Sequence, residues 1–169
     1  MGNTMKMRLI LGLVALSFSY LTTASAAQKE RFYPRGCNDK SVQYSGDHVI
    51  LGATPSDHKY RVFVFKNISY DPISLHYTPP ANKFSYSMVS TLQPELWSAL
   101  LVNEQNFTLT CKSSNDYYGM PYNCSDVIRA CELAVSPVML SSQGEYWITE
   151  NNHSKGALFR NIRSQGIYP

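Results

Sequence analysis

The chain lacks the sequence patterns of the common catalytic and metal-binding sites. It contains no G-x-S-x-G, no H-E-x-x-H and no glycine-rich phosphate loop. Its acidic residues are scattered among predicted turns, so no pair of carboxylates can be named for glycoside hydrolysis. Its cysteines form no C-x-x-C pair, which argues against a zinc site and against a thiol oxidoreductase. The sequence therefore predicts no catalytic residues, no metal ligands and no cofactor, and it does not indicate an enzyme.

A membrane-spanning segment is also missing. The longest apolar run, at 9–21, has about 13 residues, whereas a spanning helix needs about 20. This run follows Lys6 and Arg8 and precedes an A-x-A cleavage site at 24–26, which is the pattern of a signal peptide. We therefore expect residues 1–26 to be removed, and we expect a soluble mature protein without a membrane span.

A strong excess of charge of either sign is absent as well. The 169 residues include 15 Lys and Arg and 12 Asp and Glu, which gives a formal net charge of +3 at pH 7. Loss of Lys6 and Arg8 with the signal peptide would lower this net charge to +1. So small a charge does not argue for nucleic acid or for an anionic membrane surface as a partner.

Cysteine is scarce, but its even number predicts two disulfides. All four cysteines lie beyond the predicted cleavage site: Cys37, Cys111, Cys124 and Cys131. An even count in a chain that enters an oxidising compartment is most simply two disulfides. The cleavage site has no cysteine to carry the lipid of a bacterial lipoprotein, and its alanines favour a bacterial exporter, while a eukaryotic secretory origin stays open. We expect the mature protein to be periplasmic or secreted.

Three disulfide pairings are possible in principle. Cys111 ends one predicted strand and Cys124 precedes the next, so a bridge between them would close the base of the intervening loop. This leaves Cys37 to pair with Cys131 and to anchor an extended N-terminal arm at 27–40. We favour this pairing, for which the loop-entropy model gives about 3 kcal/mol from the shorter closure and somewhat over ~4 kcal/mol from the longer one.

Apolar and polar residues alternate through much of the remaining chain, which is typical of strands. The predicted strands are 60–67, 73–77, 84–88, 107–111, 127–135 and 146–148, and the apolar segment 96–102 holds Trp97. Segment 60–67 has apolar residues on both faces and is predicted to be a central strand. Short strands separated by turn residues predict an antiparallel β-sandwich, immunoglobulin-like or jelly-roll-like, as a single domain at 41–169.

A segment near the C-terminus predicts a short helix instead. Ser154 can cap this helix, and Gly166 stands in its C-terminal stop position. Leu158, Phe159 and Ile162 share one of its faces. We expect the helix to cover one open end of the sandwich.

The segment 125–133 permits two interpretations. Its apolar residues alternate from Val127 onwards, which favours a strand. Ser125 could also cap a helix that would place Cys124 and Cys131 on one face. We favour the strand.

Histidines are the remaining candidates for general-base chemistry. There are four of them, His48, His58, His76 and His153. His76 alternates with apolar residues in a predicted strand, where a surface histidine is the simpler interpretation. Two others directly follow an aspartate in predicted turns, at 47–48 and 57–58, and adjacent residues on an extended chain point apart. We therefore do not expect the repeated Asp-His dipeptide to form a metal site or a catalytic triad.

Large side chains within the polar loop 112–123 form the candidate binding surface. They are Tyr117, Tyr118, Met120 and Tyr122. Exposed tyrosines supply contact area at low entropic cost and are common at recognition surfaces. The alternative is that these rings fold back and pack the loop.

Four stretches carry a resemblance to a known family: W-S-A-L at 97–100, N-F-T-L-T-C at 106–111, C-S-D-V-I-R-A-C at 124–131 and G-E-Y-W-I-T-E-N at 144–151, together with Ile162, Arg163 and Gly166. In these stretches the chain resembles the enhanced-entry EnhB-like proteins, which are small exported bacterial proteins. The resemblance covers roughly residues 60–169 and includes no catalytic motif. It therefore implies a fold and a setting of host interaction and virulence, without a reaction.

The leading hypothesis is a non-catalytic exported domain that binds a protein partner at the cell envelope or at a host surface during host-cell entry. One alternative is a small periplasmic hydrolase that acts on envelope glycan or peptide, and convergence of His, Asp or Glu residues in a pocket would favour it. Another alternative is a structural subunit of a surface assembly, which an unpaired sheet edge would favour.

Mass spectrometry of the exported protein should find the mature N-terminus at Ala27 or Gln28, because the A-x-A site follows a short apolar run without a stop-transfer segment. Exported protein that retains Met1 would contradict the assignment of a cleaved signal peptide.

Overall fold

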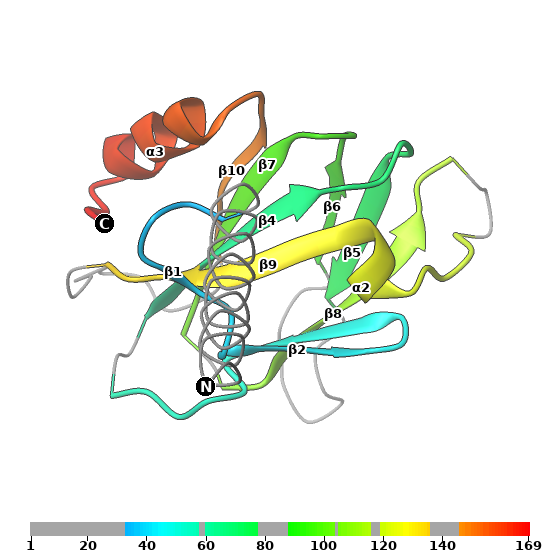
Figure 1. Ribbon diagram of the computed structural model, residues 1–169, viewed down its shortest axis with the longest axis horizontal. Helices are drawn as coiled ribbons and strands as arrows, with labels where there is room; N and C mark the ends of the chain where they lie inside the picture. The colour runs from blue at the N-terminus through cyan, green and yellow to red at the C-terminus, as the bar shows by residue number, and fades with distance from the viewer. Residues whose placement is uncertain (1–32, 58–59, 78–87, 104, 116–118, 136–145) are drawn as a thin grey trace, which may run out of the picture. The chain divides into compact units, whose positions relative to one another are not determined.

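The computed structural model describes residues 33–57, 60–77, 88–103, 105–115, 119–135 and 146–169 (Figure 1). The chain divides into two compact units, Met1–Arg35 and Gly36–Pro169. Only residues 33–35 of the first unit are among those described, so the fold is that of the second unit. Within the described residues, no helix is long and apolar enough to span a membrane.

Two antiparallel five-stranded sheets form the described fold, which confirms the predicted β-sandwich. The first, which we call sheet A, has the order β1 (Cys37–Asn38), β9 (Ile128–Leu133), β4 (Arg61–Asn67), β7 (Trp97–Val102), β10 (Tyr146–Asn152). The second, sheet B, has the order β2 (Val42–Ser45), β3 (His48–Leu51), β8 (Phe107–Ser113), β5 (Ile73–Tyr77), β6 (Met88–Leu92). The predicted central strand is β4, which lies in the middle of sheet A.

The hydrophobic core lies between the two sheets. Phe63 and Leu100 from sheet A and Leu75 and Phe107 from sheet B are at most 1 % exposed and belong to one cluster. The rings of Tyr77 and Phe107 stack with their centroids 4.1 Å apart. Burial of each such side chain is worth about 1.5 to 3 kcal/mol relative to exposure, so the alternation of apolar residues accounts for the strands.

The outer side of sheet A is also apolar, which explains why β4 has apolar residues on both faces. Val62 and Val64 face away from the core and are at most 1 % exposed. Helix α3 (Lys155–Ser164) lies against β7 and β10 and buries Leu158 and Ile162 completely. We expected this helix to cover an open end of the sandwich, but it packs along the side of sheet A because its apolar face meets an apolar sheet surface. Ser154 caps it as predicted, since its Oγ accepts a hydrogen bond from the backbone N–H of the third helical residue.

Both predicted disulfides are confirmed. Cys37 of β1 is bonded to Cys131 of β9, with the Cα atoms 5.6 Å apart, so the bond secures a two-residue edge strand. Cys111 of β8 is bonded to Cys124, with the Cα atoms 5.5 Å apart. Cys124 begins the short helix α2 (Cys124–Val127), which leads into β9. The second disulfide therefore joins sheet B to a segment that enters sheet A.

The segment 125–133, for which the sequence permitted either a strand or a helix, contains both. Residues 128–133 form the favoured strand, and the single turn α2 precedes it. The residue at the N-cap position of α2 is Asn123 rather than Ser125, and its side chain makes no capping bond. Its Oδ1 accepts a hydrogen bond from the hydroxyl of Ser125, and its Nδ2 donates to the carboxylate of Asp126. The backbone N–H of Ile68 donates to the carbonyl of Val127 at 2.9 Å, which fixes the junction of helix and strand.

The sequence prediction missed the hairpin of β2 and β3. Its turn contains Gly46 with φ of 58°, a left-handed conformation that suits glycine. Val49 and Leu51 of β3 are completely buried, and the hydroxyl of Tyr44 in β2 accepts a 2.8 Å hydrogen bond from the backbone N–H of Ala130 in sheet A. The signal was present in the sequence as alternation at 42–45 and an apolar run at 49–51 on either side of a Gly-Asp pair.

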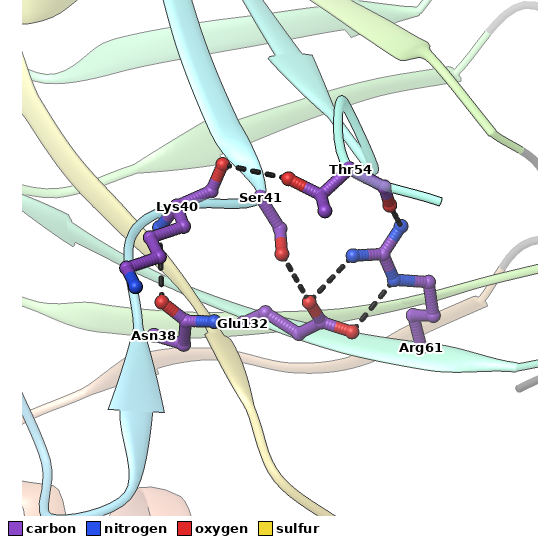
Figure 2. A network of polar contacts seen from close by, with 6 residues as sticks. All are labelled: Asn38, Lys40, Ser41, Thr54, Arg61 and Glu132. Atoms are coloured by element: carbon purple, nitrogen blue, oxygen red, sulfur yellow. Dashed lines mark hydrogen bonds and ion pairs between the residues drawn. The ribbon is translucent and has the colours of Figure 1, made fainter. Parts of the chain in front are cut away.

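A largely buried ion pair between Arg61 and Glu132 lies at one end of the sandwich (Figure 2). Arg61 is 5 % exposed, and its Nε and Nη2 atoms lie 2.6 and 2.5 Å from the two carboxylate oxygens of Glu132. Ser41 donates its hydroxyl to the same carboxylate at 2.5 Å, and the carbonyl of Thr54 accepts a 3.0 Å bond from Arg61 Nη1. Both charged residues stand on the core side of sheet A, since Glu132 is the register partner of Phe63. The bidentate geometry and the extra bonds compensate for the removal of two charges from water.

Replacement of Glu132 by Gln should lower the free energy of unfolding by about 3 kcal/mol, because Arg61 would stay buried without a counter-charge. The double variant R61M/E132M should be less destabilised than E132Q, since no unpaired charge remains. Urea unfolding of the oxidised protein measures both values. An E132Q variant as stable as the unmodified protein would contradict a structural role for the pair.

Candidate binding surface at one end of the sandwich

The strand register brings four loops together at the end opposite to the Arg61–Glu132 pair. They are 46–47 between β2 and β3, 68–72 between β4 and β5, 93–96 between β6 and β7, and the described residues 114–115 and 119–123 of the connection from β8 to α2. We call this region the loop end. The β2–β3 turn, the segment 119–123 and α2 lie on the right-hand side of Figure 1.

Hydrogen bonds to a backbone carbonyl tie two of these loops to each other. The N–H and the hydroxyl of Ser114 both donate to the carbonyl of Pro72, at 3.3 and 3.0 Å. The far side of loop 114–123 folds back on β8, because Ser113 N–H donates to the carbonyl of Met120 and Tyr122 N–H donates to the carbonyl of Cys111. The described parts of loops 68–72 and 114–123 are therefore held in one arrangement.

A single buried amide orders the loop between β4 and β5. Asn67 is 0 % exposed, and its Nδ2 donates to the carbonyls of Asp71 and Leu92 at 2.8 and 2.9 Å. Its Oδ1 accepts bonds from the N–H and the hydroxyl of Ser69 at 2.8 and 2.7 Å. Because all of these bonds converge on one side chain that water does not reach, loop 68–72 is fixed to the ends of β4 and β6.

The two cysteines of the Cys111–Cys124 disulfide also hold the β2–β3 turn at the loop end through hydrogen bonds. Cys124 N–H donates to the carbonyl of Gly46 at 2.8 Å, and Cys111 N–H donates to the carbonyl of Asp47 at 2.9 Å. The sulfur of Cys124 also lies 3.1 Å from the Asp47 carbonyl oxygen. A covalent bond and two hydrogen bonds therefore meet at this turn.

Two large side chains project into solvent from these fixed loops. Tyr70 is 98 % exposed and Met120 is 60 % exposed. Tyr70 lies two residues before Pro72, whose carbonyl accepts the two hydrogen bonds from Ser114. The carbonyl of Met120 accepts a hydrogen bond from the N–H of Ser113. Tyrosine and methionine are enriched at protein interfaces, where they supply large contact areas. Sequence analysis missed Tyr70, because the Ser-Tyr-Asp-Pro segment indicates only a turn.

The structure places the four sequence-predicted surface residues differently. Tyr117 and Tyr118 lie outside the described residues. Met120 projects into solvent, whereas Tyr122 is partly buried and packs against the hydrophobic core. The alternative that a ring packs the loop therefore applies to Tyr122.

Asp47 and His48 make a contact that we did not expect from the sequence. Asp47 Oδ1 lies 2.6 Å from His48 Nδ1, because Asp47 stands in the hairpin turn and not in an extended strand. The two side chains are 38 and 46 % exposed, so the contact lies at the open surface. Among the described residues, no three of His, Cys, Asp and Glu stand close enough to hold a metal ion.

The other histidines do not join this contact. His76 lies on the outer side of sheet B, and Thr110 of β8 separates it from His48 in the strand register. Burial, and to a lesser degree the positive charge of Lys112, lower the pKa of His76 below its ordinary value of 6.5. His153 is exposed, and His58 lies outside the described residues. The prediction that the chain is not an enzyme stays a prediction.

Comparison with protein-family models, with curated proteins and with solved structures gives no match to the chain. The geometry of the loop end is thus the basis on which a function can be argued.

The lowered pKa of His76 should make the protein less stable as the pH falls. The unfolded chain takes up a proton near pH 6.5, while the folded protein does so only at a lower pH, so this contribution to stability is complete above 6.5 and is lost below it. A Lys112→Met variant should raise the pKa of His76 in an NMR titration, because a repelling charge is removed. Lys40→Met, at the other end of the sandwich, should leave it unchanged. An unchanged value in the Lys112 variant would contradict the electrostatic contribution.

Proposed function

We propose that the chain is an exported, non-catalytic protein-binding domain and that the loop end is its binding surface. The observation that carries this proposal is the exposure of Tyr70 and Met120 on loops that Ser114 ties together through Pro72. The partner is a protein at the bacterial envelope or at a host-cell surface.

The fixed loops make the surface suitable for binding. Association costs free energy when loops and side chains must be ordered. This cost is smaller for a surface whose loops are already held in place. At the loop end the ordering is supplied by the Asn67 amide and by the Cys111–Cys124 disulfide. At the opposite end, the charged groups of Arg61 and Glu132 bond to each other and to neighbouring protein groups.

Export is the second part of the proposal. Two disulfides suit an oxidising compartment, and residues 1–26 have the pattern of a signal peptide. We therefore place the mature protein in the periplasm or outside the cell. The resemblance to EnhB-like proteins supports a setting of host interaction, with the loop end as the part of the fold that meets the partner.

A structural role in a surface assembly is the second candidate, and β6 favours it. This strand is at the edge of sheet B, and within the described part of the chain no strand pairs with its far side. Its five residues pair regularly with β5, include no charged residue, and leave Val89 60 % exposed. An uncharged, regular edge strand can accept a further strand from another chain.

The double variant Y70S/M120S should bind its partner at least about tenfold more weakly, because large interface side chains each contribute more than ~1 kcal/mol when they are hot spots. Its thermal stability should be nearly unchanged, since exposed substitutions alter stability by about 0.5 kcal/mol or less each. Quantitative pull-down from envelope and host-membrane extracts, followed by affinity measurement on the recovered partner, tests this prediction.

The matched control is V89S/Y168S, which removes two exposed apolar side chains outside the four loops. Equal capture by Y70S/M120S and the unmodified protein would remove the loop end as the binding surface. Loss of capture in the control alone would transfer the function to the β6 edge or to the C-terminus.

A further inference from the structure

The two described sheets have four edge strands, and three of them are short, irregular or engaged. Strand β1 has two residues and is held by the disulfide of Cys37, while the ladder of β10 with β7 contains two register shifts. On β2, the N–H of Val42 donates to the carbonyl of Asp39, and the Tyr44 hydroxyl bonds to sheet A. The remaining edge is β6, which pairs regularly with β5 along its whole length.

The hydrogen bonds of β8 fix the direction of the backbone groups across sheet B. In an antiparallel sheet, the N–H and C=O of one residue point to the same side, and those of the next residue point to the opposite side. The N–H of Cys111 donates to the carbonyl of Asp47, on the β3 side of β8. The backbone groups of Thr110 therefore point to the β5 side, where its register partner is His76.

The same alternation places two residues of β6 with their backbone groups facing outward. Because His76 points to β8, its neighbour Leu75 points to β6, where its register partner is Ser90. Val89 and Thr91, on either side of Ser90, therefore direct their N–H and C=O groups away from sheet B. No hydrogen bond among the described residues uses these outward groups, and the Val89 side chain is 60 % exposed.

Asn151 closes this open edge at one end. Gln93 follows the same alternation, and its N–H donates to Asn151 Oδ1 at 3.0 Å. This bond confirms the outward direction, because Asn151 belongs to β10 of the other sheet and not to β5. Within the described part of β6, the open groups are therefore those of Val89 and Thr91, and Ser90 is their midpoint.

We propose that β6 pairs with the β6 of a second copy of the chain, antiparallel and about a two-fold axis at Ser90. Val89 of each copy exchanges both N–H···O bonds with Thr91 of the other, so all four open groups of each copy are satisfied. The two B sheets then form one continuous sheet. This inference develops the second candidate function, assembly through β6, and does not depend on the loop end.

The side chains of β6 suit this self-pairing. Val89 lies opposite Thr91 of the second copy on the outer face of sheet B, and both are β-branched residues that favour strands. Met88 lies opposite Leu92 of the second copy, on the face that packs on the core. The strand carries no charge, so no like charges meet across the axis.

Charge also favours a second copy as the occupant. Edge strands that remain solitary commonly carry lysine or proline, which oppose pairing, and β6 contains neither. A second copy offers an equally uncharged strand whose open groups have the same spacing. It therefore matches the edge in charge, length and hydrogen-bonding pattern.

Sedimentation velocity of the oxidised protein, from micromolar to millimolar concentration, tests the self-association. We expect a monomer–dimer equilibrium that follows the concentration. A protein that stays monomeric throughout this range would overturn the proposal.

Amide hydrogen exchange locates the interface. The N–H groups of Val89 and Thr91 should exchange rapidly in the dilute monomer and slowly in the dimer, whereas that of Ser90, which faces β5, should be slow in both. A dimer that protects another part of the fold would overturn the proposal. Slow exchange of Val89 and Thr91 in the monomer would also overturn it, because the chain itself would then cover the edge.

Paired charge variants test the antiparallel register. In V89K/T91K, lysines stand opposite lysines, so self-association should weaken at least about tenfold, and V89E/T91E should behave in the same way. An equimolar mixture of the two variants should restore the dimer, because each lysine then meets a glutamate. Restoration would also show that both variants are folded. A mixture that stays monomeric would overturn the proposed pairing.

The matched control is Q43K/S45K, which adds the same charge at two exposed positions of β2, the opposite edge of sheet B. It should dimerise like the unmodified protein. Equal weakening in Q43K/S45K and V89K/T91K would overturn pairing through β6 in favour of a general effect of charge.

The outcomes also distinguish this inference from the proposed binding surface. If the protein is monomeric at every concentration while Y70S/M120S loses the recovered partner, the loop end stands and the dimer is rejected. If the β6 variants behave as expected while Y70S/M120S retains the partner, the dimer stands and the loop end is rejected.

Discussion

The Cys111–Cys124 disulfide is the constraint on which the loop end depends. It joins β8 of sheet B to the turn that becomes β9 of sheet A, so it fixes the two sheets relative to each other at that end. The backbone N–H groups of the same two cysteines donate to the carbonyls of Gly46 and Asp47, which brings the β2–β3 turn to the same point. The disulfide and these two hydrogen bonds therefore hold three segments together at one point, namely the end of β8, the start of α2 and the β2–β3 turn.

The opposite end depends on the register of β9. Adjacent residues of a strand face opposite sides of a sheet, and here Cys131 faces outward to bond Cys37 while Glu132 faces inward to pair with Arg61. A slip of one residue would exchange them, which would break the disulfide and place an unpaired arginine beside the core. The buried ion pair thus specifies the strand register, a role that is better founded than a net gain in stability, since the desolvation of both charges offsets much of their attraction.

Most of the fold could be predicted from the sequence, because burial imposes a period of two on strands such as 73–77 and 107–111 and a capped apolar face on α3. The β2–β3 hairpin was missed since its strands are short and carry His48 among apolar residues. The candidate site could be predicted only in part. Met120 and Tyr122 stand two residues apart in a loop, yet one projects into solvent and the other packs on the core. A loop has no period that would distinguish them, and the exposure of Tyr70 depends on hydrogen bonds from Asn67 to residues distant in the chain.

Burial separates the residues that stabilise the fold from the exposed residues that would recognise a partner. Asn67, the disulfides and the Arg61–Glu132 pair use groups that are buried or largely buried and that bond to other groups of the protein. Tyr70, Asp71 and Met120 are all exposed, and no side-chain hydrogen bond or ion pair fixes Asp71 to the described residues. Their backbones are held while their side chains are not, so substitutions at these positions can alter recognition at little cost in stability. A rigid sandwich with replaceable side chains on fixed loops can keep one fold while its partner changes.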